Sequence, residues 1–422
     1  MSVVAVSSTS THSLRRCAPY LVRLTASLAL LTASLAVGAQ TLQITSAGPG
    51  DPEPILVRIF AAIERGKLTE ALQLTDSLLK EKPNFRLGHL IRGDLLLARV
   101  KPLPSFGAVA SVNQAGAGPE PQARVRELRE EALLRLKAYR EKPPKDAVPR
   151  YLLQMKPDQK HAVIVDTKKS RLYVYENAKG QPRFVADYYI SQGKNGPDKW
   201  KEGDQKTPVG VYHITRSVPR EKLTDFYGAG ALPINYPNEW DKRLGRTGHG
   251  IWLHGTPPDT FSRAPRATDG CVVLANQDFE SIGRYVQTGM TPVVISEEVE
   301  WLKLDDWNRE RNSLNVAIEK WRRDWESMNI ERYLSHYHQD FSGDGNSLTQ
   351  WSQKKRAINA AKSWIKVGVD NISMLRYPGK DDMVVVTFDQ NYRSSNLSNS
   401  ATKKQYWTLG KTGWKIIDES TL

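Results

Sequence analysis

Cys271 and His254 have the side-chain types and the spacing that nucleophilic catalysis requires. They lie in two short stretches, GHGIWLHGT at 248–256 and ATDGCVVLAN at 267–276. A thiol nucleophile needs an imidazole to accept its proton and backbone N–H groups to bind the developing oxyanion. Gly270 leaves room for a carbonyl group beside Cys271, and His254 ends a predicted strand. We therefore predict that Cys271 is the nucleophile and His254 the general base, brought together by the loop between them.

The N-terminus has the pattern of an export signal. Basic residues up to Arg23 precede an apolar run over 24–37, and Val37-Gly38-Ala39 then provides the small residues that signal peptidases recognise. The run is short for a membrane span. We predict a signal peptide over residues 1–39, cleavage after Ala39 and a periplasmic location, with membrane contact through the signal alone. An uncleaved anchor and a twin-arginine signal at Arg15-Arg16 are the alternatives.

The number of cysteines limits the roles that the Cys271 thiol can have. The chain has 2 cysteines, Cys17 and Cys271, and cleavage would remove Cys17. A single remaining cysteine cannot form an internal disulfide, so Cys271 is a reactive thiol, an intermolecular partner or a small buried residue.

The formal net charge of +14 suits either an anionic cell wall or nucleic acid. The sequence has no zinc-ligand spacing, no basic helix with heptads and no aromatic-basic run typical of RNA-binding proteins. We therefore predict a wall partner and no nucleic-acid partner.

The length of 422 residues predicts two or three domains, and the periodicity changes along the chain. Residues 51–150 have helical periodicity, and the segment AIERGKLTEALQLTDSLLKEKPNFRLGHLIRGDLLLA resembles a tetratricopeptide-type hairpin followed by another helix. Residues 160–296 contain β-rich runs separated by turn residues, with one helix predicted over 276–288. We predict a largely antiparallel or barrel-like domain there.

Residues 304–422 combine an aromatic-rich helical stretch with alternating strands and resemble an NTF2-like cone. The aromatic residues are predicted to be core, and His336 and His338 to lie at the surface or the mouth of the cone. Two histidines without a third ligand do not indicate a zinc site. The fold class is thus multidomain α+β, with a helical N-terminal region, a β-rich central domain and an α+β C-terminal domain.

The central motifs resemble the catalytic signature of the L,D-transpeptidases of YkuD type. In that family a His-Gly ends one strand, and a Ser/Thr-x-Gly-Cys turn follows some fourteen to eighteen residues later. Here His254-Gly255 and Thr268-Asp269-Gly270-Cys271 match it, together with IVDTKKSRLYVYE, KTPVGVYHI and MTPVVI. The resemblance covers roughly residues 160–296.

The resemblance implies that Cys271 attacks the carbonyl of the third residue of a tetrapeptide stem of peptidoglycan and that the terminal D-Ala leaves. An amine of a second stem or of a lipoprotein would resolve the thioester into a crosslink. Gly255 would orient His254 through its carbonyl, and the amides of Gly270 and Cys271 are candidates for the oxyanion hole. Thr268 and Asp269 are candidate substrate-side residues of the same turn. No metal or organic cofactor is implied.

Two residues depart from the crosslinking members of the family, which commonly carry His before the Gly-Cys and Arg two residues after the Cys. Asp269 and Val273 occupy these positions here, and loss of the Arg removes a donor for a substrate carboxylate. An L,D-carboxypeptidase that trims tetrapeptide to tripeptide, as in cell-shape relatives with an NTF2-like domain, is therefore one alternative. A non-catalytic wall-binding scaffold is another, and a protein partner or homodimer through the helical or NTF2-like part fits each.

Overall fold

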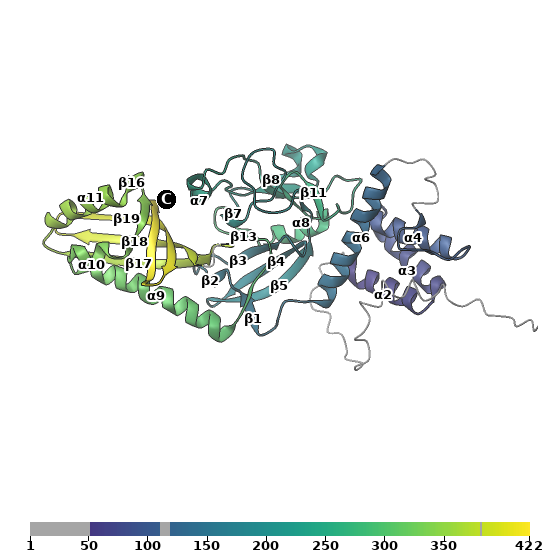
Figure 1. The fold of residues 1–422 in the computed structure, drawn as a ribbon, viewed down its shortest axis with the longest axis horizontal. Coiled ribbons are helices and arrows are strands. Elements are labelled where there is room, and N and C mark those ends of the chain that lie inside the picture. The colour runs from purple at the N-terminus through teal and green to yellow at the C-terminus, as the bar shows by residue number, and fades with distance from the viewer. Residues whose placement is uncertain (1–50, 110–118, 380–381) are drawn as a thin grey trace, which may run out of the picture.

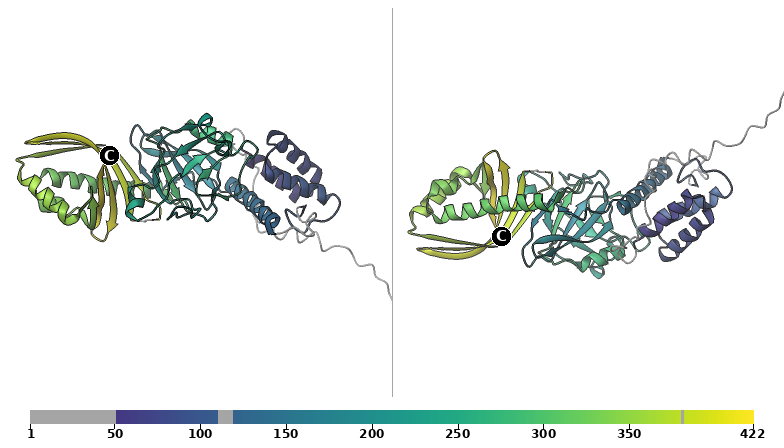
Figure 2. Two further views of the ribbon diagram at one scale, coloured as in Figure 1. Left: turned by 90° about the horizontal axis from the view of Figure 1, so that it is seen from above. Right: turned by 90° about the horizontal axis from the view of Figure 1, so that it is seen from below.

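The computed structural model describes residues 51–109, 119–379 and 382–422. Three parts follow one another along the long axis of the molecule: a helical region, a β-rich central domain and a C-terminal domain of helices packed against a sheet (Figure 1; Figure 2). The predicted signal peptide over 1–39 and its cleavage site lie outside the described residues.

In the described part of the helical region, four helices share one apolar core. They are α2 (Glu53–Glu64), α3 (Leu68–Glu81), α4 (Arg86–Ala98) and α6 (Pro119–Arg140). Leu56 and Ile59 of α2, Leu78 of α3 and Ile91 of α4 are buried in this core because their spacing places them on one face of each helix. The predicted helical character is confirmed, whereas the tetratricopeptide character stays a prediction.

Two short strands connect the parts of the chain. β1 (Ala147–Pro149) pairs with β14 (Trp301–Lys303), and β2 (Leu152–Gln154) joins the edge of the C-terminal sheet. β1 lies within the range 51–150 that the sequence assigns to helices. It is a strand because Val148 is buried in the core of the C-terminal domain, where a strand partner is available.

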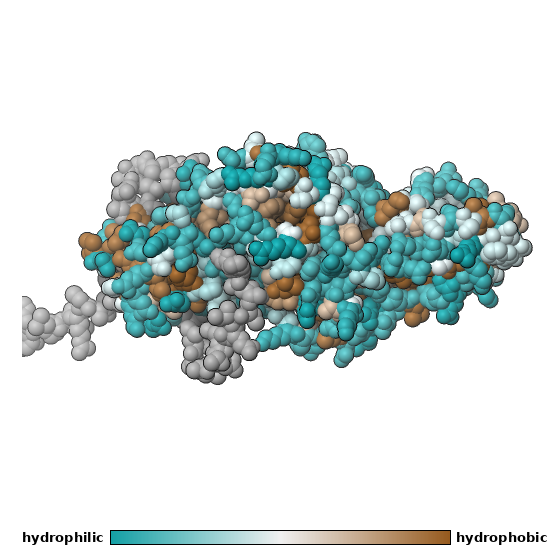
Figure 3. Space-filling view, turned by 180° about the vertical axis from the view of Figure 1, so that it is seen from behind, coloured by the Kyte–Doolittle hydropathy of each residue, from teal (hydrophilic) through white to brown (hydrophobic). Residues whose placement is uncertain are grey.

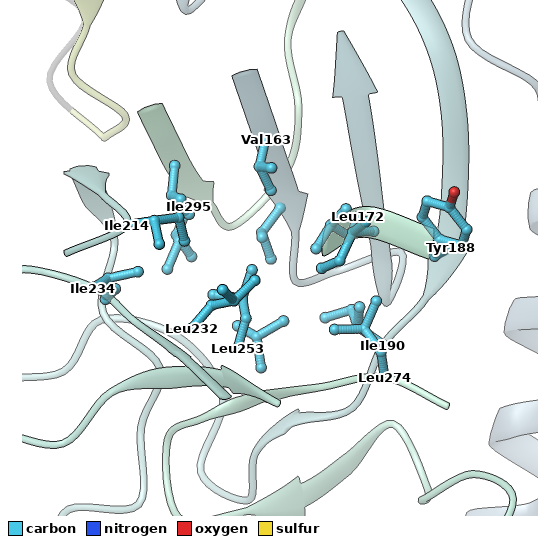
Figure 4. Packing of buried hydrophobic residues seen from close by; sticks show 14 of the residues in the cluster. Val163, Leu172, Tyr188, Ile190, Ile214, Leu232, Ile234, Leu253, Leu274 and Ile295 are labelled. Carbon is cyan, nitrogen blue, oxygen red and sulfur yellow. The ribbon is translucent and has the colours of Figure 1, made fainter. Parts of the chain in front are cut away.

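The central domain consists mainly of two sheets that face each other. Their orders are β5-β4-β3-β13-β7 and β12-β10-β9-β8. The bounds of these strands are β3 (His161–Asp166), β4 (Arg171–Ala178), β5 (Gln181–Tyr189), β7 (Gly210–His213), β8 (Val218–Pro219), β9 (Gly230–Pro233), β10 (Trp252–His254), β12 (Val272–Val273) and β13 (Pro292–Ser296). Side chains such as Val163 and Leu172 from the first sheet meet Leu232 and Leu253 from the second, as Figure 4 shows. The sheets are mixed, because β13 is parallel to β3 and β10 is parallel to β12.

Shorter elements complete the central domain. They are β6 (Gln192–Gly193), η1 (Arg220–Lys222), η2 (Asp225–Tyr227), α7 (Glu239–Arg243), β11 (Arg266–Thr268) and α8 (Asn276–Gly283). β6 and β11 pair in parallel beside the predicted nucleophile turn. α8 ends at Gly283, earlier than the sequence predicts.

The C-terminal domain packs its helices, among them the long α9, against one side of a seven-stranded sheet ordered β16-β15-β20-β19-β18-β17-β2. Its elements are α9 (Leu304–Glu326), α10 (Ile330–Leu334), β15 (Tyr337–Gly343), β16 (Asn346–Ser347), α11 (Leu348–Ala360), β17 (Ile365–Arg376), β18 (Met383–Ser394), β19 (Leu397–Gly410) and β20 (Gly413–Thr421). Trp321, Tyr333 and Phe341 are core residues, as predicted. His336 is not at the surface, because its ring is buried with Nε2 2.7 Å from Asp324 Oδ2.

Much of the surface seen from behind is hydrophilic, and the apolar residues there form separate patches (Figure 3). Within residues 51–109, 119–379 and 382–422, no helix combines the length and the apolar character that crossing a membrane requires.

Candidate active site

The pairing of two neighbouring strands sets the positions of the predicted nucleophile and the predicted base. β10 and β12 are parallel neighbours, with Leu253 opposite Val272 and His254 opposite Val273. Cys271 directly precedes β12, so the thiol and the imidazole start from adjacent strands. The 255–265 loop and β11 lie between them in sequence, and pairing of β11 with β6 turns the chain back.

The His254 ring is buried and fixed in one tautomer. Its Nδ1 lies 2.7 Å from the carbonyl oxygen of Gly255, which can only accept a hydrogen bond. The proton is therefore on Nδ1, and Nε2 keeps a free lone pair. Burial lowers the pKa of His254 to about 4, and the Gly255 carbonyl opposes that shift only in part. The imidazole is thus a neutral base at physiological pH.

Aromatic side chains enclose the imidazole. The ring centroids of Tyr227 and Phe226 lie 5.1 Å and 5.7 Å from that of His254, and Trp252 lies 4.9 Å from Tyr227. Phe226 is 50% exposed, so this wall faces solvent on one side. An apolar wall keeps water away from the base and offers a surface to the alkyl parts of a ligand.

Cys271 keeps partial exposure, and its thiol donates a hydrogen bond to the carbonyl oxygen of Gly250 at 3.4 Å. Burial raises the pKa of the Cys271 thiol, with the backbone of Trp252 and the charge of Arg263 opposing it. Within the described part of the chain, the thiol bonds to Gly250 and not to the His254 ring. The resting pair is therefore a neutral thiol and a neutral imidazole.

The turn before the thiol is held by the Thr268 side chain. Its Oγ1 accepts from the Gly270 amide at 3.1 Å and donates to the Cys271 carbonyl at 2.7 Å. Gly270 has φ +127°, and a Cβ there would lie 2.7 Å from the Lys206 carbonyl oxygen, so a side chain is excluded. The Gly270 amide is already bonded to Thr268, so it does not point freely at a ligand, in contrast to its predicted place in the oxyanion hole. Thr268, buried beneath the turn, braces it instead of facing a substrate.

Asp269 lies on the outer side of this turn. Its side chain is 73% exposed, and Oδ1 accepts from Lys194 Nζ and Gln205 Nε2, each at 3.0 Å. Thr207 supports the same turn from within, because its Oγ1 accepts from the Gly193 amide and donates to the Gly270 carbonyl. The segment over 193–207 therefore buttresses the nucleophile turn.

Asn276 is a positioning residue that was not predicted from the sequence. Its Oδ1 accepts from the amides of Ala229 and Thr256 at 2.9 Å and 3.1 Å, and its Nδ2 donates to the Thr256 carbonyl at 2.9 Å. A Cβ on Gly255 would lie 2.1 Å from that Oδ1. Gly255 is thus required for close approach, and the position of Asn276 five residues after Cys271 is the sequence signal that could have revealed it.

The helical region contacts the 255–265 loop directly. The rings of Phe85 and Phe261 lie 4.9 Å apart, and Asn84 Nδ2 donates to the Pro258 carbonyl at 3.1 Å. Ser262 Oγ donates to Glu131 Oε1 of α6 at 2.7 Å. The helices therefore hold the loop that connects the imidazole to the thiol.

A buried ionic network fixes the helical region to the central domain. Arg135 of α6 lies 2.7 Å from Glu53 and 2.9 Å from Glu131, and its guanidinium stacks 3.8 Å above the Tyr189 ring. Arg171 of β4 joins the same Glu53 at 3.1 Å. Removing one partner from such a network leaves a buried charge without compensation, which is strongly destabilising.

Comparison with known proteins places these parts in a family. A family model of the L,D-transpeptidase catalytic domain (YkuD) matches residues 160–295, and one of the Cds6 C-terminal NTF2-like domain matches residues 313–420. The solved structure of Bd1075 from Bdellovibrio bacteriovorus is 30% identical, with a TM-score of 0.58, and the alignment covers 65% of this chain and 98% of that one.

Pgp2 from Campylobacter jejuni, described as a helical cell shape determining protein, is 28% identical with a TM-score of 0.56. Its alignment covers 64% of this chain and 95% of Pgp2. A search of curated protein sequences returned no match. The chain therefore belongs to the family of proteins that join a YkuD-type L,D-transpeptidase catalytic domain to a C-terminal NTF2-like domain.

Proposed function

We propose that this protein is an exported peptidoglycan L,D-transpeptidase in which Cys271 forms a thioester with the tetrapeptide stem. The observation that supports the proposal is the parallel pairing of β10 with β12, because His254 and Cys271 start from these adjacent strands and the thiol keeps partial exposure. The family of the catalytic domain supports peptidoglycan as the substrate.

In the first half-reaction, Cys271 Sγ forms a bond to the carbonyl carbon of the third stem residue while His254 Nε2 accepts the thiol proton. The C–N bond to D-Ala then breaks, and the proton on His254 passes to the leaving amine. Both groups start neutral, so proton transfer accompanies the attack and is not completed beforehand.

In the second half-reaction, an acceptor amine forms a C–N bond to the thioester carbon and the C–S bond breaks. His254 takes a proton from the amine and returns it to the thiolate, which restores the resting state. The product is a crosslink between two stems or an attachment to the wall.

Trimming by an L,D-carboxypeptidase is the second candidate, in which water replaces the amine. Val273 favours it, because this side chain is buried at 2% exposure in β12 and gives the site no cation at that position. The similarity to Pgp2 supports a role in cell shape under either outcome.

Mass spectrometry of muropeptides tests the proposal. Purified protein would be added to tetrapeptide-rich sacculi, with Cys271→Ala and His254→Gln as test variants and His338→Gln of the C-terminal domain as the matched control. Dimers linked through two third-position residues, present with wild type and His338→Gln and absent with Cys271→Ala, are the expected result. Tripeptides without dimers would establish the carboxypeptidase. Unchanged muropeptides would leave the non-catalytic wall-binding scaffold and refute both enzymes.

Export is tested separately by the mass of the protein recovered from the periplasm. Cleavage after Ala39 gives a chain that begins at Gln40. Recovery of the intact chain in the membrane fraction would establish the uncleaved anchor instead.

A further inference from the structure

Arg263 is a cation beside the predicted thiol, and no ion pair joins it to a carboxylate of the described residues. It lies half-buried on the 255–265 loop, with its guanidinium 4.6 Å from the centre of the Phe226 ring. Phe226 in turn lies against His254. The positive charge of Arg263 reaches both reacting groups, since it lowers the pKa of Cys271 and of His254.

The nearby carboxylate does not neutralise this arginine. Asp269 directs Oδ1 to Lys194 and Gln205 and lies on the outer side of the turn. Across residues 51–109, 119–379 and 382–422, the guanidinium of Arg263 forms no hydrogen bond or ion pair and contacts the Phe226 ring. Burial lowers the pKa of Arg263, so the fold bears a cost for holding an unpaired guanidinium there.

A second arginine approaches from the helical region. Arg86 is the first residue of α4, is exposed and lies close enough that its charge also lowers the pKa of Arg263. The contacts of Asn84 and Phe85 with the loop place it there. Two arginines near each other, neither with a carboxylate partner in the described part of the chain, favour an anionic ligand between or beside them.

The backbone of Arg263 is anchored while its side chain remains available. Its carbonyl accepts from Tyr189 OH at 3.0 Å, and the next carbonyl, that of Ala264, accepts from Ser191 Oγ at 2.5 Å. These two hydrogen bonds fix the backbone that carries the guanidinium at the edge of the site, and a binding residue needs such a fixed backbone. Val273 in β12 is apolar and buried, so the strand after Cys271 does not supply this charge.

We propose that Arg263, supported by Arg86 of the helical region, binds a carboxylate of the peptide stem next to Cys271. This inference rests on the proposed function and adds to it the residue that selects a stem with a free carboxylate. A planar guanidinium can bind a carboxylate through two parallel hydrogen bonds, which Lys or Gln cannot reproduce. The helical region would then form part of the substrate site.

Two carboxylates are available in a tetrapeptide stem, one on the terminal D-Ala and one on the side chain of a diaminopimelate at the third position. Three synthetic stems distinguish them: the natural tetrapeptide, its C-terminal amide and an analogue with L-Lys at the third position. Release of the fourth residue would be measured as kcat and KM, with full-length wild type, Arg263→Gln, Arg263→Lys and Arg86→Gln. Arg216→Gln is the matched control, because Arg216 is an exposed arginine of the same domain.

Loss of a charge-assisted bond predicts a fall in kcat/KM for the natural stem on the order of 10- to 100-fold in Arg263→Gln, mainly through KM. Arg263→Lys should recover part of the loss, Arg86→Gln should show a smaller loss, and Arg216→Gln should match wild type. Wild type should have a lower kcat/KM for one of the two modified stems. A lower value for the amide assigns the D-Ala carboxylate to Arg263, and a lower value for the L-Lys analogue assigns the side-chain carboxylate. Arg263→Gln should abolish this difference.

Equal losses on all three stems, or an Arg263→Gln variant that behaves like Arg216→Gln, would overturn the inference. Thermal unfolding of each variant separates a folding defect from a binding defect. If wild type shows no Cys271-dependent turnover of any stem, the proposed function fails, and calorimetric binding of the three stems still tests Arg263. Equal affinity of wild type and Arg263→Gln for the natural stem would refute carboxylate binding there.

Discussion

The resting state of Cys271 and His254 gives the sharpest test of the site. Because burial raises the thiol pKa and lowers the imidazole pKa, the structure predicts a neutral pair and not a preformed thiolate–imidazolium pair. A thiol with the ordinary pKa of 9.0 is about 1% ionised at pH 7, and Cys271 is ionised less. Protonating His254 inside the fold costs roughly 3 kcal/mol more than in water, from a pKa of about 4 against 6.5.

Alkylation by iodoacetamide measures the thiolate directly. In a chain that begins at Gln40, Cys271 is the single thiol. The alkylation rate should rise about tenfold per pH unit between pH 6 and 9, because it follows the ionised fraction of the thiol. His254→Gln should leave that profile nearly unchanged. For turnover of the tetrapeptide, kcat/KM should fall on the acid side near pH 4, where the free-enzyme base becomes protonated. An alkylation plateau below pH 7 that disappears in His254→Gln would show a preformed ion pair and refute the reasoning.

Three further predictions concern stability. Gly270→Ala should lower the free energy of unfolding by about 1–3 kcal/mol and abolish turnover, because the φ of Gly270 is +127°. Gly283→Ala is the control and should not lower it, because open space surrounds Gly283. Urea denaturation measures both variants. Arg135→Ala should lower the free energy of unfolding by about 3–5 kcal/mol, because buried Glu131 loses its arginine and buried Glu53 keeps Arg171 alone. The exposed Arg92→Ala should lower it by about 0–1 kcal/mol, and similar losses for the two variants would contradict this. Burial raises the pKa of Asp278 to about 6, so native stability falls as pH rises from 3.8 through 6. Asp278→Asn should therefore raise the Tm at pH 8 and leave it nearly unchanged at pH 3, and a lower Tm at pH 8 would contradict the shift.

Helices and strands could be predicted from the sequence where apolar side chains recur with the spacing of a helix or form the short apolar run of a strand. The strands β3 and β4 follow from short apolar runs that are buried along most of their length. The helix α9 follows from apolar residues that recur with the helical period on one buried face. The candidate site was also predicted from the sequence, because the His254-Gly255 motif is followed by the turn from Thr268 to Cys271. The strand β1 was assigned to the helical part, because its pairing with β14 involves residues more than 150 positions away, as in Ala147 with Lys303.

The sequence by itself determined the reactive residue types, their order and the family resemblance, because these depend on neighbours along the chain. Only the tertiary structure decided that the Gly270 amide bonds to Thr268 and that the helical region reaches the site. It also decided that Arg263 forms no ion pair with any carboxylate in the described part of the chain. The contact of Ser262 with Glu131 spans 131 residues. Such contacts depend on how separately folded segments pack, and no local period or spacing encodes which side chains then meet.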